Sequence, residues 1–230
     1  MSADRRATIR TLQAQLAALA PAASRDEAVD EAGPLTGLLG PAWRSGGMVE
    51  LCGPDPVTLS LAAWLAARRD GPVVLIDPAG KPCADAFAAL RLDPQRLLIV
   101  RPQEGRLVLW AAEQSLRCAG VAATICRVGP RLGTVTTRRL KLASEAGGGI
   151  GLVVRPAARE PPFADARLLV RPVRSEGTET LCPRWEVNAV YVRGGTEERS
   201  CVVEVTADAR LVSVASELAR TAGSRRRVGG

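Results

Sequence analysis

The chain has 230 residues, of which 47% are hydrophobic, so it can bury one substantial core with small appendages. Its formal net charge is +7, carried almost wholly by arginine, which favours a polyanion or an acidic protein as partner. No apolar run approaches the ~20 residues of a membrane span, and the N-terminus has no secretory signal. We therefore expect a cytoplasmic protein without membrane contact.

The chain has no histidine and six cysteines without a C-x-x-C pair, which excludes the common zinc sites and the usual general base. Cys52 and Cys126 lie in apolar, strand-like runs, where a free cysteine behaves as a small buried hydrophobe. We expect structural thiols rather than redox groups.

Residues 1–20 carry apolar side chains at helical spacing, namely Ile9, Leu12, Leu16 and Leu19. This pattern predicts an amphipathic helix, followed by a linker over residues 21–32. A separate helix packs either on the core or on a neighbouring molecule, so Ile9, Leu12 and Leu16 are candidate partner-binding residues.

Residues 33–208 are expected to form the core. Apolar strands alternate with helices in its first part. The strands are 48–52, 72–77, 97–100, 122–128 and 150–155, and the helices are one marked by Leu61, Trp64 and Leu65 that ends near Arg69, and 84–90, 107–119 and 135–146. This alternation predicts an α/β fold with a mainly parallel sheet flanked by helices. Three further strands, 167–173, 184–193 and 200–206, have no helices between them and are expected to add antiparallel pairs at one sheet edge, with a hairpin turn at Arg193–Thr196.

Residues 209–230 form a C-terminal segment with a basic tail. Leu211, Val214 and Leu218 recur at i, i+3 and i+7, as in a partner-binding helix or a helix packed on its own core. The tail ends in candidate DNA-binding residues Arg225, Arg226 and Arg227, which could equally be a solubilising end.

The stretch from Met48 to Ser60 has the strand-loop-helix setting of a phosphate-binding P-loop. Against the pattern G-x-x-x-x-G-K-[ST], Gly53 and Ser60 match, but the second glycine is Thr58 and the lysine is Leu59. Pro56 also removes an amide donor from the phosphate cradle. This degenerate loop predicts that nucleotide binding is lost, and that Pro56 and Leu59 fill the space of the phosphate. Weak, non-standard nucleotide binding stays open.

Three stretches carry a resemblance to known proteins: residues 46–54, residues 138–148 (RRLKLASEAGG) and the strand 167–173 before Trp185. In this order, from Pro34 to Val192, they resemble the core ATPase domain of RecA-like recombinases, and more closely the ImuA accessory proteins of bacterial mutagenesis cassettes. The resemblance implies a RecA-like fold and allows the family's catalytic positions to be checked.

Each catalytic position that the resemblance identifies lacks its residue. The general base is replaced by Ala79, which cannot take a proton from water. The magnesium-holding acid of the Walker B strand is replaced by Arg127, which would repel the metal. The polar pair that senses the γ-phosphate is replaced by Arg155-Pro156. We therefore expect no enzyme activity, cofactor or metal.

The resemblance places two DNA-contacting loops at Gly129–Thr134 and Ala157–Ala164, and both are short. Arg127, Arg131, Arg155 and Arg159 are expected to leave positive charge on that edge, with Phe163 as the one stacking ring. Arg131 and Arg159 are therefore candidate DNA-binding residues for weak contact. Arg138, Arg139 and Lys141 are expected on a solvated helix face.

The implied function is that of a non-catalytic adaptor for translesion DNA synthesis in the SOS response. Its implied partners are an ImuB-like inactive Y-family polymerase and an error-prone DnaE-type polymerase, with RecA as a further contact. Three alternatives stay open: a SulA-like cell-division inhibitor, a modulator of RecA filaments, and a residual ATPase.

Overall fold

The computed structural model describes residues 32–80, 84–156, 158, 160–174, 183–194 and 199–214. The predicted N-terminal helix over residues 1–20, almost all of the linker over residues 21–32 and the basic tail therefore lie outside the described residues.

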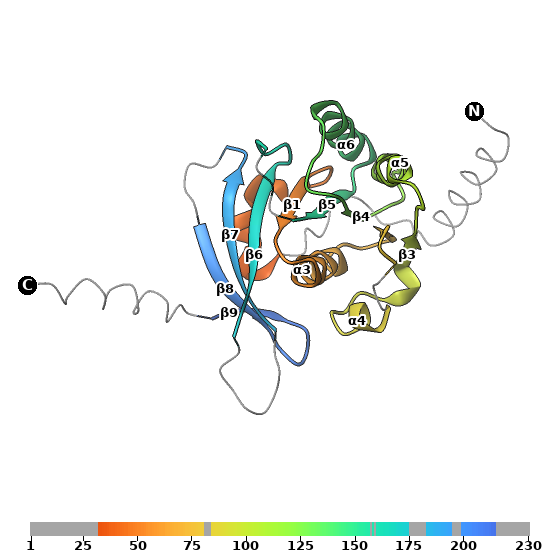
Figure 1. Cartoon of the computed structure of the whole chain (residues 1–230). Coiled ribbons are helices and arrows are strands. Elements are labelled where there is room, and N and C mark those ends of the chain that lie inside the picture. Colours follow the sequence, from red (N-terminus) through yellow and green to blue (C-terminus); the bar gives the residue numbers. More distant parts are fainter. Residues whose placement is uncertain are drawn as a thin grey trace, which may run out of the picture.

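One sheet runs through the described part of the chain, with nine strands in the order β3-β2-β4-β5-β1-β6-β7-β8-β9 (Figure 1). The strands are β1 (Met48–Cys52), β2 (Val73–Ile76), β3 (Leu97–Val100), β4 (Ala123–Arg127), β5 (Ile150–Arg155), β6 (Ala166–Val173), β7 (Arg184–Val192), β8 (Arg199–Val205) and β9 (Leu211–Val214). Strands β1 to β6 pair in parallel, and β7, β8 and β9 are added as an antiparallel extension.

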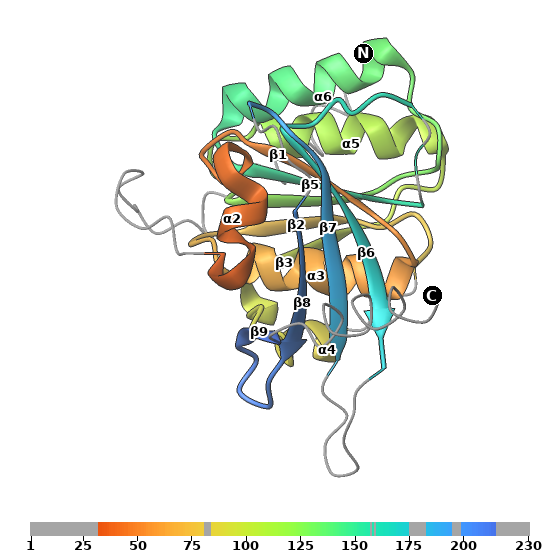
Figure 2. The same ribbon diagram turned by 90° about the vertical axis from the view of Figure 1, so that its left-hand side faces the viewer.

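Helices cover both faces of the parallel part. They are α2 (Thr36–Leu39), α3 (Asp55–Ala67), α4 (Ala84–Ala88), α5 (Gly105–Arg117) and α6 (Thr134–Gly147), with 3-10 turns at Gly33–Leu35, Gly40–Ala42 and Pro94–Arg96. Helix α3 packs on one face, whereas α5 and α6 lie together over the other (Figure 1). Helix α2 lies against the antiparallel extension at β7 (Figure 2). None of the helices described is long and apolar enough to cross a membrane.

The burial of the strands follows from this layering. Strands β1 and β2 are buried along their whole length because helices cover both faces of this part of the sheet, as in parallel α/β proteins. Two apolar clusters result, one centred on α3 and Trp64, the other between the sheet and the α5–α6 pair. Helix α6 approaches α5 closely at Gly147, where a Cβ would lie 1.9 Å from the carbonyl oxygen of Leu116.

The predicted α/β fold class is confirmed, and most predicted elements lie within two residues of their expected bounds. Two details were wrong. Strand β6 was expected to be an antiparallel addition, but it pairs in parallel with β1. Residues 211–214 were expected to be helical, yet they form β9, which pairs with β8, and Leu211 is buried in the core. The sheet therefore continues past residue 208, and the apolar spacing of this segment reflects core packing.

Candidate functional site

The carboxyl ends of the parallel strands β1, β2, β4 and β5 meet at one edge of the sheet, where ligands bind in open α/β folds. A cleft of about 480 Å³ lies there, and its lining includes Gly53, Ala79, Arg127, Arg131 and Pro156. This edge therefore contains the degenerate P-loop and the lost catalytic positions.

The connection that should form the phosphate-binding loop is almost absent. Only Gly53 and Pro54 separate β1 from α3, because the helix already begins at Asp55. Positions 55–58, which would wrap around a phosphate in a P-loop, instead form the first turn of the helix.

Few amide groups are left for an anion in this turn. Pro54 and Pro56 have no N–H. The amide of Gly53 donates to the carbonyl of Arg155 at 3.2 Å, and those of Val57 and Thr58 donate to the carbonyl of Pro54 at 3.1 and 3.0 Å. The cradle of free N–H groups that a P-loop offers is therefore mostly occupied by the protein itself.

Gly53 matches the P-loop pattern for a structural reason. Its φ is +152°, and a Cβ would lie 2.2 Å from the carbonyl oxygen of Val170 on β6. The close approach of strand β6 therefore requires glycine here, whether or not a phosphate is bound.

The other degenerate P-loop residues belong to helix α3. Thr58 is fully buried, and its hydroxyl donates to the carbonyls of Pro54 and Asp55, both at 3.1 Å. The Ser60 hydroxyl donates to the carbonyl of Pro56 at 2.7 Å. Leu59 packs in the α3 core, whereas Pro56 is exposed. The expectation that Pro56 fills the space of a phosphate was therefore wrong.

Arg127 bridges two acidic residues at this edge of the sheet. Its Nε donates to Oδ1 of Asp55 at 3.1 Å, and its Nη2 contacts Oδ2 of the same carboxylate, so the pair is bidentate. Its Nη1 contacts Oδ1 of Asp77, which is fully buried at the end of β2. A single guanidinium thus bridges two carboxylates at the position where a magnesium-holding acid would stand.

Asp55 adds a second obstacle to anion binding. It lies in the first turn of α3, where the helix dipole favours a negative charge. Its carboxylate therefore occupies the helix N-terminus where a phosphate would otherwise bind. A phosphate would also have to compete with this carboxylate for Arg127.

A second buried ion network lies beside the first and centres on Glu50 of β1, which is fully buried. Arg155 donates to its Oε1 at 3.1 Å, and Arg167 donates to Oε2 and Oε1 at 2.7 and 3.1 Å. Arg155 is itself 1% exposed. Glu50 was not recognised in the sequence, although a carboxylate inside an otherwise apolar strand signals a buried partner.

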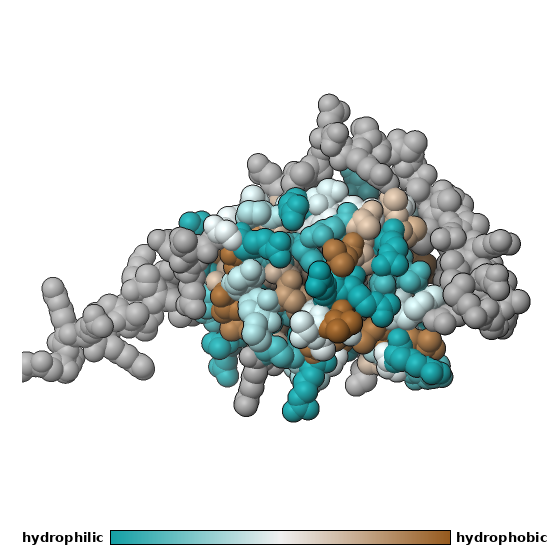
Figure 3. Space-filling view, turned by 90° about the horizontal axis from the view of Figure 1, so that it is seen from above, coloured by the Kyte–Doolittle hydropathy of each residue, from teal (hydrophilic) through white to brown (hydrophobic). Residues whose placement is uncertain are grey.

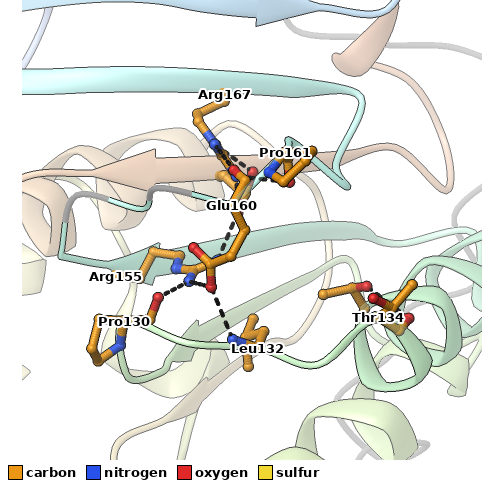
Figure 4. A network of polar contacts seen from close by, with 9 residues as sticks. Pro130, Leu132, Thr134, Arg155, Glu160, Pro161 and Arg167 are labelled. Carbon is orange, nitrogen blue, oxygen red and sulfur yellow. Dashed lines mark hydrogen bonds and ion pairs between the residues drawn. The ribbon is translucent and has the colours of Figure 1, made fainter.

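Glu160 extends this network to the two loops that would contact DNA in a recombinase. Its carboxylate accepts from Arg155 at 3.0 Å and from the backbone N–H of Leu132 at 3.2 Å. Arg155 also donates to the carbonyl of Pro130, and Arg167 donates to that of Glu160 at 2.7 Å (Figure 4). The described residues of the two loops are thereby tied together over the strand ends.

Because of these contacts, the edge of the sheet displays less positive charge than the sequence predicted. Arg127 and Arg155 are 11% and 1% exposed and are neutralised internally, so the positive charge expected from them is not displayed. Arg131 is exposed and stays a candidate for DNA contact, whereas Arg159, Arg225, Arg226 and Arg227 lie outside the described residues. Phe163 packs against the α5–α6 core and does not form a free stacking platform.

The charged residues of α6 and the candidate partner-binding residues differ in part from the sequence predictions. Lys141 is buried rather than solvated, because it pairs with the buried Asp165, whereas Arg138 and Arg139 are exposed. Among the candidate partner-binding residues, Leu211 is buried and Val214 lies in β9, so neither presents a helix face. Ile9, Leu12, Leu16 and Leu218 lie outside the described residues.

The cysteines that the structure describes are free thiols: Cys52, Cys118, Cys126 and Cys201. Burial raises the pKa of Cys126 to about 12 and that of Cys201 to about 11. At neutral pH both are thiols rather than thiolates, which is the inert state expected of structural cysteines.

The pKa of Glu160 provides a test of the hydrogen bonds by which its carboxylate connects the two loops. Hydrogen bonds from its own backbone N–H, from Arg155 and from the Leu132 N–H lower the pKa of Glu160 to about 2 from a usual value near 4.5. Because the folded state favours the ionised form, the stabilisation is complete above pH ~4.5 and is lost as the pH falls towards 2. In thermal unfolding, Glu160→Gln should have a lower Tm than the parent protein at pH 7, and this difference in Tm should narrow between pH 4.5 and 2. A constant difference in Tm over this range would contradict the lowered pKa of Glu160.

Comparisons with known proteins agree with this topology. No protein-family model matches the sequence, and no curated protein matches it. Among solved structures, the crystal structure of the RadB recombinase is similar, with a TM-score of 0.60 at 14% sequence identity, over 78% of this chain and 96% of that one. Identity this low shows the fold alone. The chain has a RecA-like fold, with a mostly parallel sheet, flanking helices and antiparallel strands at one edge.

Proposed function

We propose that this chain is a non-catalytic RecA-like adaptor that supports a translesion DNA synthesis complex during the response to DNA damage. The proposal that the protein has no catalytic activity is supported chiefly by the ion pairs of Arg127 with Asp55 and Asp77. A protein that used this edge for ATP would need free amides and a metal-holding acid there. In this protein most of the amides donate to backbone carbonyls, and Arg127 stands at the position of the metal-holding acid.

The role as an adaptor in translesion synthesis is supported by the sequence resemblance to the ImuA accessory proteins and by the RecA-like fold. In this proposal the protein works by binding other proteins. Its partners would be an ImuB-like inactive Y-family polymerase and an error-prone DnaE-type polymerase, with RecA as a further contact.

Nucleotide chemistry gives the first test. We expect the full chain to show no magnesium-dependent ATP hydrolysis, and the double variant Thr58→Gly/Leu59→Lys to show none either. The added lysine would enter the α3 core, and Arg127 would still occupy the strand ends. Magnesium-dependent turnover that Ser60→Ala abolishes would identify a residual ATPase and refute the proposal.

Partner capture from cells with damaged DNA gives the second test. The full chain should retain the two polymerase-like partners, and a variant that ends after Val214 would show whether the tail is needed. Truncation after Asp208 is a poor choice, because it removes β9 and the buried Leu211. Recovery of a tubulin-like division protein without any polymerase component would favour a SulA-like inhibitor instead.

A further inference from the structure

A groove lies between helices α5 and α6, on the side of the sheet opposite α3. Its volume is about 720 Å³, and we call it the α5–α6 groove, lined chiefly by Leu107, Leu109, Trp110, Thr136, Arg139 and Leu140. Viewed from above, this side of the molecule shows hydrophobic side chains set among hydrophilic ones (Figure 3). The groove thus has an apolar floor with polar surroundings, as protein-binding grooves do.

Exposed apolar side chains are concentrated on the helix that borders the groove. Three large hydrophobic side chains stand out as exposed in the described residues, and two of them, Val135 at 75% and Leu142 at 53%, are on α6. They are spaced i and i+7 with Arg138 between them, so all three share one side of the helix, which borders the groove without being part of its lining. Neither valine nor leucine is needed there for the core.

The charge around the groove is positive. Glu113 is the acid between the two helices, and it is buried and paired with both Arg117 and Arg139. One acid facing two arginines leaves one excess positive charge. Exposed Arg138 adds another, and Arg106 is balanced by Glu104. Lys141 contacts the exposed Glu145 but also pairs with the buried Asp165, so Glu145 offsets part of the positive excess.

Leu109 lines both the groove and the cleft at the strand ends, so the two adjoin at this residue. The cleft adds apolar contacts from Val108 and Leu132 and the exposed Arg131.

We propose that the α5–α6 groove binds an acidic amphipathic helical segment of a partner protein. The proposal rests on the adaptor function and names the chemistry of one partner. Apolar residues at i, i+3 or i+4 and i+7 would pack on Leu109 and Trp110 in the groove and on Leu142 beside it. Carboxylates would face Arg139 of the lining and Arg138 next to it. A nucleic acid would match the charge but not the exposed valine and leucine. The chain's own first twenty residues hold Arg5, Arg6 and Arg10 against one acid, Asp4, so charge disfavours them as the occupant.

The experiment is a selection of displayed peptides of roughly 16 residues, about four helical turns, on the full-length protein. We expect enrichment of peptides with Asp or Glu between apolar residues at helical spacing. In fluorescence anisotropy, the double variant Arg138→Glu/Leu142→Asp should bind an enriched peptide at least about tenfold more weakly, because it loses an apolar contact and reverses a charge. The matched control Arg171→Glu/Val212→Asp, at an exposed arginine of β6 and an exposed valine of β9, should bind as the parent does.

Several outcomes would overturn the proposal. These are no enrichment, enriched peptides that bind the double variant unchanged, or a single-stranded oligonucleotide that alone loses affinity in the double variant. Self-association lost only in the double variant would identify a second copy as the occupant, which also overturns it. Failure here leaves the adaptor function intact if ATP is still not hydrolysed and polymerase partners are still captured. Measurable ATP turnover would instead refute the adaptor function.

Discussion

Replacing Glu50 by glutamine is expected to lower the free energy of unfolding by about 4 kcal/mol, because it removes the buried carboxylate that pairs with two buried guanidinium groups. Among the carboxylates that the structure describes, Arg155 would then keep only the half-buried Glu160. Glu50 is fully buried, Arg155 is 1% exposed and Arg167 is 7% exposed, so water cannot replace the lost charge. For a chain of this length the loss corresponds to a drop in Tm of about 8–16 °C. Urea unfolding followed by circular dichroism would measure it.

The control for this prediction is the half-buried pair of Arg184 and Glu204, each 21% exposed, on neighbouring strands of the antiparallel extension. Glu204→Gln should cost no more than about 1 kcal/mol, because solvent screens this pair. Replacing Glu50, Arg155 and Arg167 together by apolar residues of similar volume should recover most of the loss, since the desolvation of all three charges disappears. If Glu50→Gln were as mild as Glu204→Gln, the network would not hold the loops in the way described.

Replacing Arg127 by alanine is expected to cost about 3 kcal/mol of stability, or a fall of about 6–12 °C in Tm. Asp77 is fully buried, and without Arg127 its carboxylate would keep, among the residues that the structure describes, only the hydrogen bond from the Ala79 N–H at 3.2 Å. Asp55 is half exposed and would be rehydrated at little cost. Thermal unfolding at pH 7 would measure the effect.

Arg131→Ala provides the comparison, because Arg131 lines the same cleft but is exposed, and its loss should change stability by less than about 0.5 kcal/mol. The double variant Arg127→Ala/Asp77→Asn should recover part of the loss, since it removes the buried charge that Arg127 neutralises. Equal effects of Arg127→Ala and Arg131→Ala would mean that the bridge to Asp77 does not form in solution.

The degenerate nucleotide site could be recognised from the sequence because it depends on the identity of residues at fixed positions. Leucine at position 59, alanine at 79 and arginine at 127 cannot hold phosphate, activate water or bind magnesium in any packing. The α/β fold was equally predictable, since a four-residue apolar strand such as β2 and an amphipathic helix such as α5 each show their own period.

What replaced the site could be learned only from the folded chain. Arg127 pairs with Asp55 and Asp77, which are 72 and 50 residues away in sequence, and Glu50 pairs with Arg167 across 117 residues. No local pattern specifies such partners, because they are brought together by the parallel pairing of distant strands. Residues 211–214 show the same limit: spacing of Leu211 and Val214 suits a helix, but pairing with β8 makes the segment a strand. In short segments the tertiary contacts outweigh local propensity. The sequence therefore determined which residue types stand at the positions of a P-loop ATPase, and the fold determined which contacts those residues make.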